Sequence, residues 1–164
     1  MESLEKKLEQ NKQEPKMTLF QRVIITGVFG GLFWGFMGSV LYYFNFSNVS
    51  PASFFPRSFM NQSWTDRWLG ELVGILTCGV ISIVVAILYY AFLKKTLGIG
   101  IGIAFGAALW GIMFWIANPI FSAVPPISSI NPTTIVATVC IYILYGTFIG
   151  YSISFDYDDT QRGN

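Results

Sequence analysis

Residues 22–44 read RVIITGVFGGLFWGFMGSVLYYF, an apolar run whose one charge is at its first position. A helix rises about 1.5 Å per residue, so a helix over this run is about 34 Å long and can cross the roughly 30 Å hydrocarbon core of a bilayer. Hydrocarbon offers the backbone no water to bond, so a spanning run of this kind must be helical. The run is also too long for the apolar part of a cleaved signal peptide. It predicts a membrane-spanning helix.

Three further runs have the same character, over residues 68–93, 98–117 and 133–155. Of the 164 residues, 53% are apolar and only 12% are charged, and the mean hydropathy is +0.54. A soluble chain of this size needs more charge to cover its surface. We therefore predict an all-α, polytopic membrane protein with four transmembrane helices in a compact bundle over residues 22–155. An N-terminal arm (1–21) and an acidic tail (156–164) are expected to lie in the cytoplasm.

The orientation follows from the lysines and arginines, which favour the cytoplasmic side of short loops. Eight of them fall on the side of the two termini and the short turn after the second run: Lys6, Lys7, Lys12, Lys16, Arg22, Lys94, Lys95 and Arg162. The opposite side has two, Arg57 and Arg67. This asymmetry predicts that both termini are cytoplasmic.

Small residues form stripes on the predicted helices. In the first run they lie on one helical face around a single indole: Gly27, Gly30, Gly31, Trp34, Gly35 and Gly38. The third run has Gly98, Gly102 and Gly106, and the fourth has Gly146 and Gly150. Lipid is as apolar as leucine, so helices associate in it by close packing, which small residues permit. We interpret the stripes as packing faces, within the chain or between copies. The alternative is that they line a ligand path or bind lipid.

The residue types argue against chemistry. The chain has no histidine, the commonest general base and metal ligand. No nucleophile–base pair or metal cluster can be assembled, so we expect no enzymatic activity and no cofactor. There is also no basic stripe of the kind that nucleic acid requires. Both cysteines, Cys78 and Cys140, fall inside predicted spans. We interpret them as small buried residues, and a disulfide between neighbouring spans as an alternative.

One acid falls inside a predicted span. Glu71 lies one turn into the second run, and Arg67 is four residues before it. We expect an ion pair between them near the membrane boundary, at a helix N-terminus that favours negative charge. The alternative is a functional carboxylate, with the hydroxyls of Tyr142 and Tyr145 on the same path.

The loop between the first two spans is rich in rings, with Phe46, Phe54, Phe55, Phe59 and Trp64. A solvated loop would rarely expose so many. We keep three alternatives: the loop lies on the membrane surface, folds back onto the helix ends, or docks a partner.

Two stretches, GVFGGLFWGFMG (27–38) and IYILYGTFIGYSISF (141–155), with NPIF (118–121) between them, resemble the YqhR family of conserved membrane proteins of Bacillus-type bacteria. The resemblance covers most of the chain after residue 17. It implies a bacterial plasma membrane and a small helical bundle. It does not indicate any particular activity or any site residues.

Two hypotheses for function remain. The first is a non-catalytic subunit or accessory protein that acts through helix–helix contacts with other membrane proteins or with copies of itself. The second is a small oligomeric transporter or channel that uses Glu71 and the mid-membrane hydroxyls.

Overall fold

The computed structural model describes residues 17–60, 62–96 and 98–162, and most of the expected N-terminal arm (1–21) lies outside this part of the chain. In the described part every regular element is a helix. Four helices are long and apolar enough to cross a membrane. These are α2 (Leu19–Tyr43), α5 (Trp68–Leu93), α6 (Ile99–Gly111) with its π-helical continuation η1 (Ile112–Ile116), and α7 (Pro132–Arg162). The predicted all-α fold with four spans is confirmed.

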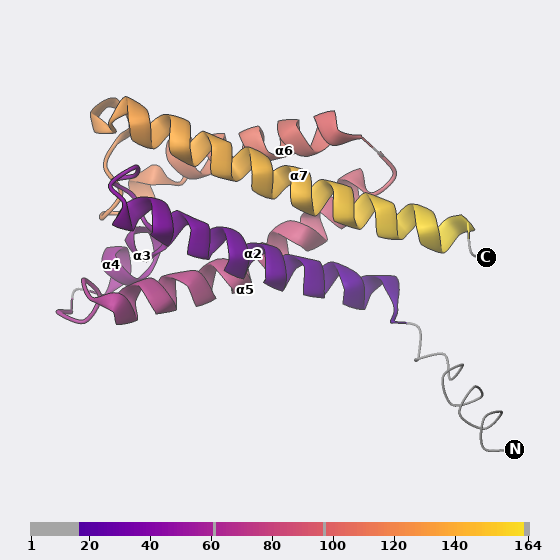
Figure 1. Cartoon of the computed structure of the whole chain (residues 1–164), viewed down its shortest axis with the longest axis horizontal. Helices are drawn as coiled ribbons and strands as arrows, with labels where there is room; N and C mark the ends of the chain where they lie inside the picture. Colours follow the sequence, from indigo (N-terminus) through magenta and orange to yellow (C-terminus); the bar gives the residue numbers. More distant parts are fainter. Residues whose placement is uncertain (1–16, 61, 97, 163–164) are drawn as a thin grey trace, which may run out of the picture.

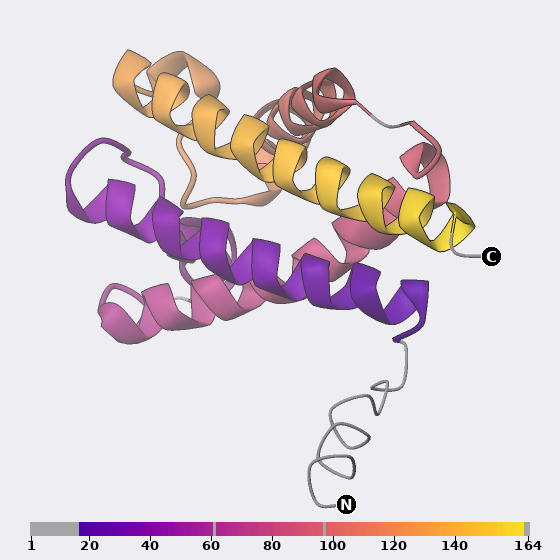
Figure 2. The ribbon, with the colours of Figure 1, turned by 45° about the vertical axis from the view of Figure 1, so that its right-hand side comes forward.

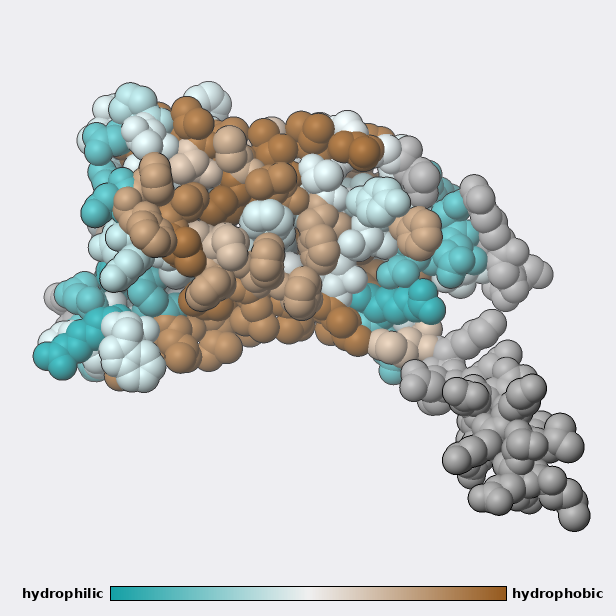
Figure 3. Space-filling view, in the orientation of Figure 1, coloured by the Kyte–Doolittle hydropathy of each residue, from teal (hydrophilic) through white to brown (hydrophobic). Residues whose placement is uncertain are grey.

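The bundle has two distinct ends (Figure 1). α2 begins, and α5 and α7 end, at what we call the terminal end. The loop end carries two short helices, α3 (Pro51–Phe54) and α4 (Pro56–Phe59), and the 3-10 turns η2 (Asn118–Ile120) and η3 (Ile127–Ser129). Figure 3 shows an apolar belt around the middle of this face, with hydrophilic residues at both ends. That distribution is what a bilayer requires of a spanning bundle.

The four long helices form two closely packed pairs, α2 with α5 and α6 with α7. The pairs join where α7 lies against α2 and α5 (Figure 2). α6 packs on α7 and shares no comparable interface with α2 or α5, so α6 is at the edge of the bundle. The main core lies among α2, α5 and α7 and consists of Val23, Ala86, Tyr89, Tyr145, Ile149 and Ile153.

Two boundaries differ from those expected from the sequence. α2 begins at Leu19, because Thr18 and Gln21 form a capping box that satisfies the first backbone groups of the helix. α7 continues to Arg162, so the segment expected as an acidic tail is helical over residues 156–162. Nothing between Phe155 and Arg162 breaks a helix, since the next glycine or proline is residue 163. Asp156, in this extension, accepts a hydrogen bond from Arg22 at 3.1 Å, which joins the two helices at the terminal end.

The loop after α2 folds back into the bundle. α3 lies against α5, where a Cβ at Gly74 would be 2.6 Å from the backbone nitrogen of Ala52. Gly74 is six residues into α5, so α3 reaches about 9 Å below the start of that helix. Phe54 packs against Phe114 and Phe121, with ring centroids 5.8 and 5.5 Å away. Of the three alternatives for this loop, folding back onto the helix ends is confirmed for Phe54, whereas Phe46, Phe55 and Phe59 remain exposed.

Candidate functional site

The glycine face of α2 lies against α5. A Cβ at Gly31 would be 2.5 Å from the carbonyl oxygen of Cys78, and a Cβ at Gly27 would be 3.0 Å from Ala86 Cβ. The contact at Gly35 is less close, since a Cβ there would be 3.2 Å from Cys78 Cβ. These helices touch backbone to backbone, which only small residues allow.

The α6/α7 pair interlocks in the same way. A Cβ at Gly102 would be 2.7 Å from Thr147 Cα, and one at Gly106 would collide with the carbonyl oxygen of Tyr142. From the other side, a Cβ at Gly146 would collide with the backbone of Gly106, and one at Gly150 would be 3.1 Å from Gly102 Cα. These four glycines are packing residues within the chain.

The remaining residues of the predicted packing set have other surroundings. A Cβ at Gly30 would meet Ile149 Cδ1 at 3.1 Å, on α7, and one at Gly38 would meet the Pro51 ring at 3.4 Å, on α3. Trp34 is half-buried against the main core, and its indole Nε1 is buried without a hydrogen-bond partner among the described residues.

Gly98 has no close packing partner on another helix of the described chain. Gly98 is exposed as the N-cap of α6, and a Cβ there would meet only Ile101 Cδ1, one turn along the same helix, at 3.8 Å. The series of three glycines in the third run therefore contributes only Gly102 and Gly106 to an interface. The helix begins where the first glycine is, so that residue precedes the packed turns.

A second small-residue face of α6 is unpartnered. It consists of Gly100, Ala104, Ala107 and Gly111, at offsets of four, seven and eleven residues, and we call it the α6 outer face. At about 100° per residue these four positions fall within about 60° of each other and opposite Gly102 and Gly106. Gly100, Ala104 and Ala107 are exposed, and a Cβ at Gly100 or Gly111 would meet nothing within 4 Å.

The acid of the second span is paired, but not with the predicted partner. Glu71 Oε1 accepts hydrogen bonds from Arg57 Nη2 at 2.9 Å and from Ser50 Oγ at 2.7 Å, and Oε2 accepts one from Ser39 Oγ at 2.8 Å. The expected pair with Arg67 is wrong: Arg67 has extended backbone and caps α5, so it is not on the helical face of Glu71.

Arg57 reaches Glu71 because the loop folds back. Its side chain is 14% exposed and that of Glu71 is 20% exposed. Arg57 also donates to Ser50 Oγ at 3.0 Å, and its guanidinium lies 5.1 Å from the centroid of the Tyr42 ring. Asp66, mostly exposed, is 3.4 Å from Arg57 Nε. This network fastens α4 and α3 to α2 and α5.

The tyrosines proposed for a transport path are separate from this network. The hydroxyl of Tyr145 is 2.6 Å from Ser82 Oγ, inside the main core, and Tyr145 is 8% exposed. Tyr142 packs with its ring 6.2 Å from that of Phe114, in the second core near the loop end. No hydrogen bond links Glu71 to either tyrosine among the described residues.

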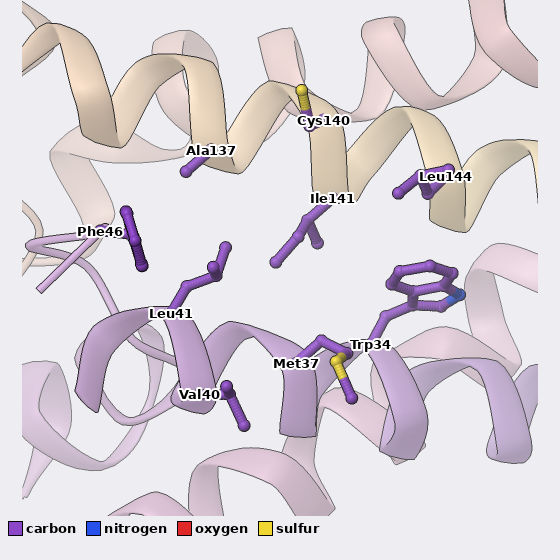
Figure 4. Close-up of a pocket in the computed structure, with 9 residues that line it drawn as sticks. All are labelled: Trp34, Met37, Val40, Leu41, Phe46, Ala137, Cys140, Ile141 and Leu144. Atoms are coloured by element: carbon purple, nitrogen blue, oxygen red, sulfur yellow. The ribbon is translucent and has the colours of Figure 1, made fainter. Parts of the chain in front are cut away.

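The structure opens an apolar groove between α2 and α7 (Figure 4). Its volume is about 410 Å³. Its walls are side chains from Trp34 to Leu41 on α2 and from Ala137 to Leu144 on α7, and Phe46 lies at the loop end. Cys140 is one of the lining residues, and it is exposed rather than buried as the sequence suggested. Cys78 is also a free thiol, so the alternative of a disulfide between them is wrong.

Comparison with known proteins places the chain in a family. The family described as "Conserved membrane protein YqhR" matches residues 3–164. This chain belongs to the YqhR family. The "Uncharacterized protein YqhR" of Bacillus subtilis (strain 168) is 40% identical to this chain over an alignment 164 residues long. The alignment covers 97% of this chain and 92% of the relative. No solved structure matches the chain. YqhR membership confirms the resemblance of the two glycine-bearing stretches and the membrane location.

Sequence reasoning missed two features that the structure brings out in this YqhR-family chain. In the sequence Arg57 is a charge in a loop, and only the fold of that loop shows that it faces Glu71. The α6 outer face was hidden because its glycines and alanines alternate with those of the packed face. The signal for the α6 outer face is visible on a helical wheel of α6, where two stripes of small residues lie on opposite sides of one helix.

Proposed function

We propose that this YqhR-family chain is a non-catalytic subunit of a larger assembly in the bacterial plasma membrane, and that a helix of another membrane protein packs on its α6 outer face. The terminal end would face the cytoplasm, because Arg22, Lys94 and Lys95 belong to that end. No reaction is assigned to the chain.

The exposed α6 outer face carries this proposal. Elsewhere in the described chain, small-residue stripes are used: those of α2, α7 and the opposite side of α6 are pressed against neighbouring helices. Small side chains give little dispersion contact with lipid but allow another backbone to approach closely. A face with three exposed small residues and space for a Cβ at Gly100 and Gly111 therefore has the character of an interface without its partner.

The edge position of α6 also supports a partner. α6 packs mainly on α7 and reaches α5 through Phe105, whose ring lies 5.0 Å from that of Tyr89. By contrast, α2 and α5 each have broad contacts with two other long helices, and α7 has them with three. A spanning helix that packs mainly on one neighbour has more lateral surface available for association than the other three helices have.

The transporter hypothesis has less support from the site. The carboxylate of Glu71 receives three hydrogen bonds, from Arg57, Ser50 and Ser39, which is the environment of a structural ion pair. The groove between α2 and α7 is lined by apolar side chains and includes neither Glu71 nor the two tyrosines. Its walls offer an ion or polar solute no ligands.

The test is to fill the α6 outer face. In the double variant Gly100→Leu/Gly111→Leu each added Cβ has no atom of the chain within 4 Å, so folding should be retained. They would hold a partner helix away, and we expect association in mild detergent to weaken about tenfold or more, equivalent to about 1.4 kcal/mol. Complex size is measured by native gel and sedimentation of the tagged chain from its native membrane.

Ala91→Leu is the matched control, because Ala91 is exposed on α5, a helix that shares no broad interface with α6. It should leave the complex unchanged. A double variant that stays in a complex of wild-type size would remove the support for this proposal, and a complex that contains only copies of the chain would replace the partner subunit by a homo-oligomer.

A further inference from the structure

The groove between α2 and α7 exists because these two helices diverge. They are in contact near Gly30, where a Cβ would be 3.1 Å from Ile149 Cδ1 and 3.2 Å from Phe148 Cε1. From Trp34 toward the loop end the helices separate, and side chains of both line the space between them (Figure 4). Trp34 closes the groove at its deep end, and Phe46 closes it at the loop end.

The size of the groove discriminates between possible occupants. An apolar cavity of about 150 Å³ holds one benzene, which has six carbons, so 410 Å³ has space for about sixteen methylene-sized carbons. A helix of about 10 Å diameter occupies roughly 800 Å³ over the rise of about 10.5 Å between Trp34 and Leu41. The groove has about half the volume of such a helix segment and matches one hydrocarbon chain.

The chemistry and depth of the groove agree with that occupant. The lining side chains are apolar throughout. The groove runs between the membrane-spanning parts of α2 and α7, where the surrounding medium is hydrocarbon. It is open at the side, so a chain can enter from the bilayer without crossing the bundle. Unfilled space at the α2/α7 contact would leave the lining atoms without dispersion partners.

We infer that the groove is a binding site for one acyl chain of a membrane phospholipid from the leaflet at the loop end. The chain lies along α2 and α7, with its methyl end against Trp34 and its head near Phe46. It fills the wedge between the two helices and exchanges more slowly than the lipid around the bundle, because protein side chains surround it on two sides.

The test compares two tryptophan substitutions on adjacent residues of α7. Ala137→Trp places an indole in the groove, whereas Val136→Trp places one on the lipid-facing surface, since Val136 is 64% exposed and is not a lining residue. Each protein is purified in mild detergent, and the retained phospholipid is counted by native mass spectrometry. We expect about one phospholipid per chain for the wild type and for Val136→Trp, and at least fivefold less for Ala137→Trp. Equal retention in both variants, or none in the wild type, would overturn the inference.

A second measurement uses the unaltered protein, in case Ala137→Trp fails to fold. The chain is reconstituted with a phospholipid that carries a diazirine in its acyl chain, exchanged briefly against unlabelled vesicles, and irradiated. Adducts that persist should concentrate on residues 34–41 and 137–144. An even spread of adducts over the lipid-facing surface would contradict a lipid site.

Discussion

Gly146→Leu will separate α6 from α7 and destabilise the bundle by about 3 kcal/mol, at the upper end of the usual cost of overpacking. A Cβ at Gly146 would collide with the backbone of Gly106, and backbone cannot move aside as a flexible side chain can. The two helices must therefore part, and their close contact is lost along Gly102, Gly106 and Gly150 as well. The expected change is measured as the free energy of unfolding in a detergent titration.

Gly111→Leu is the matched control for Gly146→Leu. It adds the same side chain to the same helix pair, but a Cβ there has no neighbour within 4 Å. Its effect on the free energy of unfolding should stay within about 0.5 kcal/mol, as for most substitutions at unconstrained surface positions. If both variants cost the same, close packing of α6 on α7 does not stabilise this chain.

Arg57→Met will destabilise the loop end by about 3 kcal/mol, because it leaves Glu71 without its cationic partner in a mostly buried position. The carboxylate then keeps only its two serine donors, and α3 and α4 lose their ion pair with α5. The free energy of unfolding and the protease sensitivity of the loop at residues 45–60 are the measurements.

The double variant Arg57→Met/Glu71→Gln should recover more than half of that loss. Glutamine is neutral, and in the place of the two carboxylate oxygens its carbonyl oxygen accepts from one serine hydroxyl while its amide N–H donates to the other. Arg67→Met, at the position that the sequence favoured as partner, should change the free energy of unfolding by less than about 0.5 kcal/mol, because Arg67 is exposed. A loss as large for Arg67→Met as for Arg57→Met would contradict the network described here.

The sequence predicted the four spanning helices because each feature involved is local. The length and hydropathy of a run determine whether it can span, and charged pairs such as Lys94 and Lys95 limit it. The glycine spacing of α2 and α7 likewise predicted close packing, since positions four apart share a helical face.

The features that the sequence did not predict depend on two things: how the loops fold, and which faces of the helices become neighbours. Arg57 lies in the short helix α4, 14 residues before Glu71, and no periodic pattern predicts the return of α3 and α4 into the bundle. Gly98 belongs to the right register, but the helix begins only after it. Which of the two small-residue faces of α6 meets α7 depends on rotation about the helix axis, which composition does not determine.

The most direct test of the account is photo-crosslinking from the α6 outer face in native membranes. A photoactivatable residue replaces Ala104, which is exposed in the middle of that face, and a control replaces Val80, which is 65% exposed on α5. We predict that the residue at position 104 forms a discrete crosslink to another membrane protein and that the one at position 80 forms adducts with lipid only. Lipid adducts alone at both positions would contradict a partner at this face.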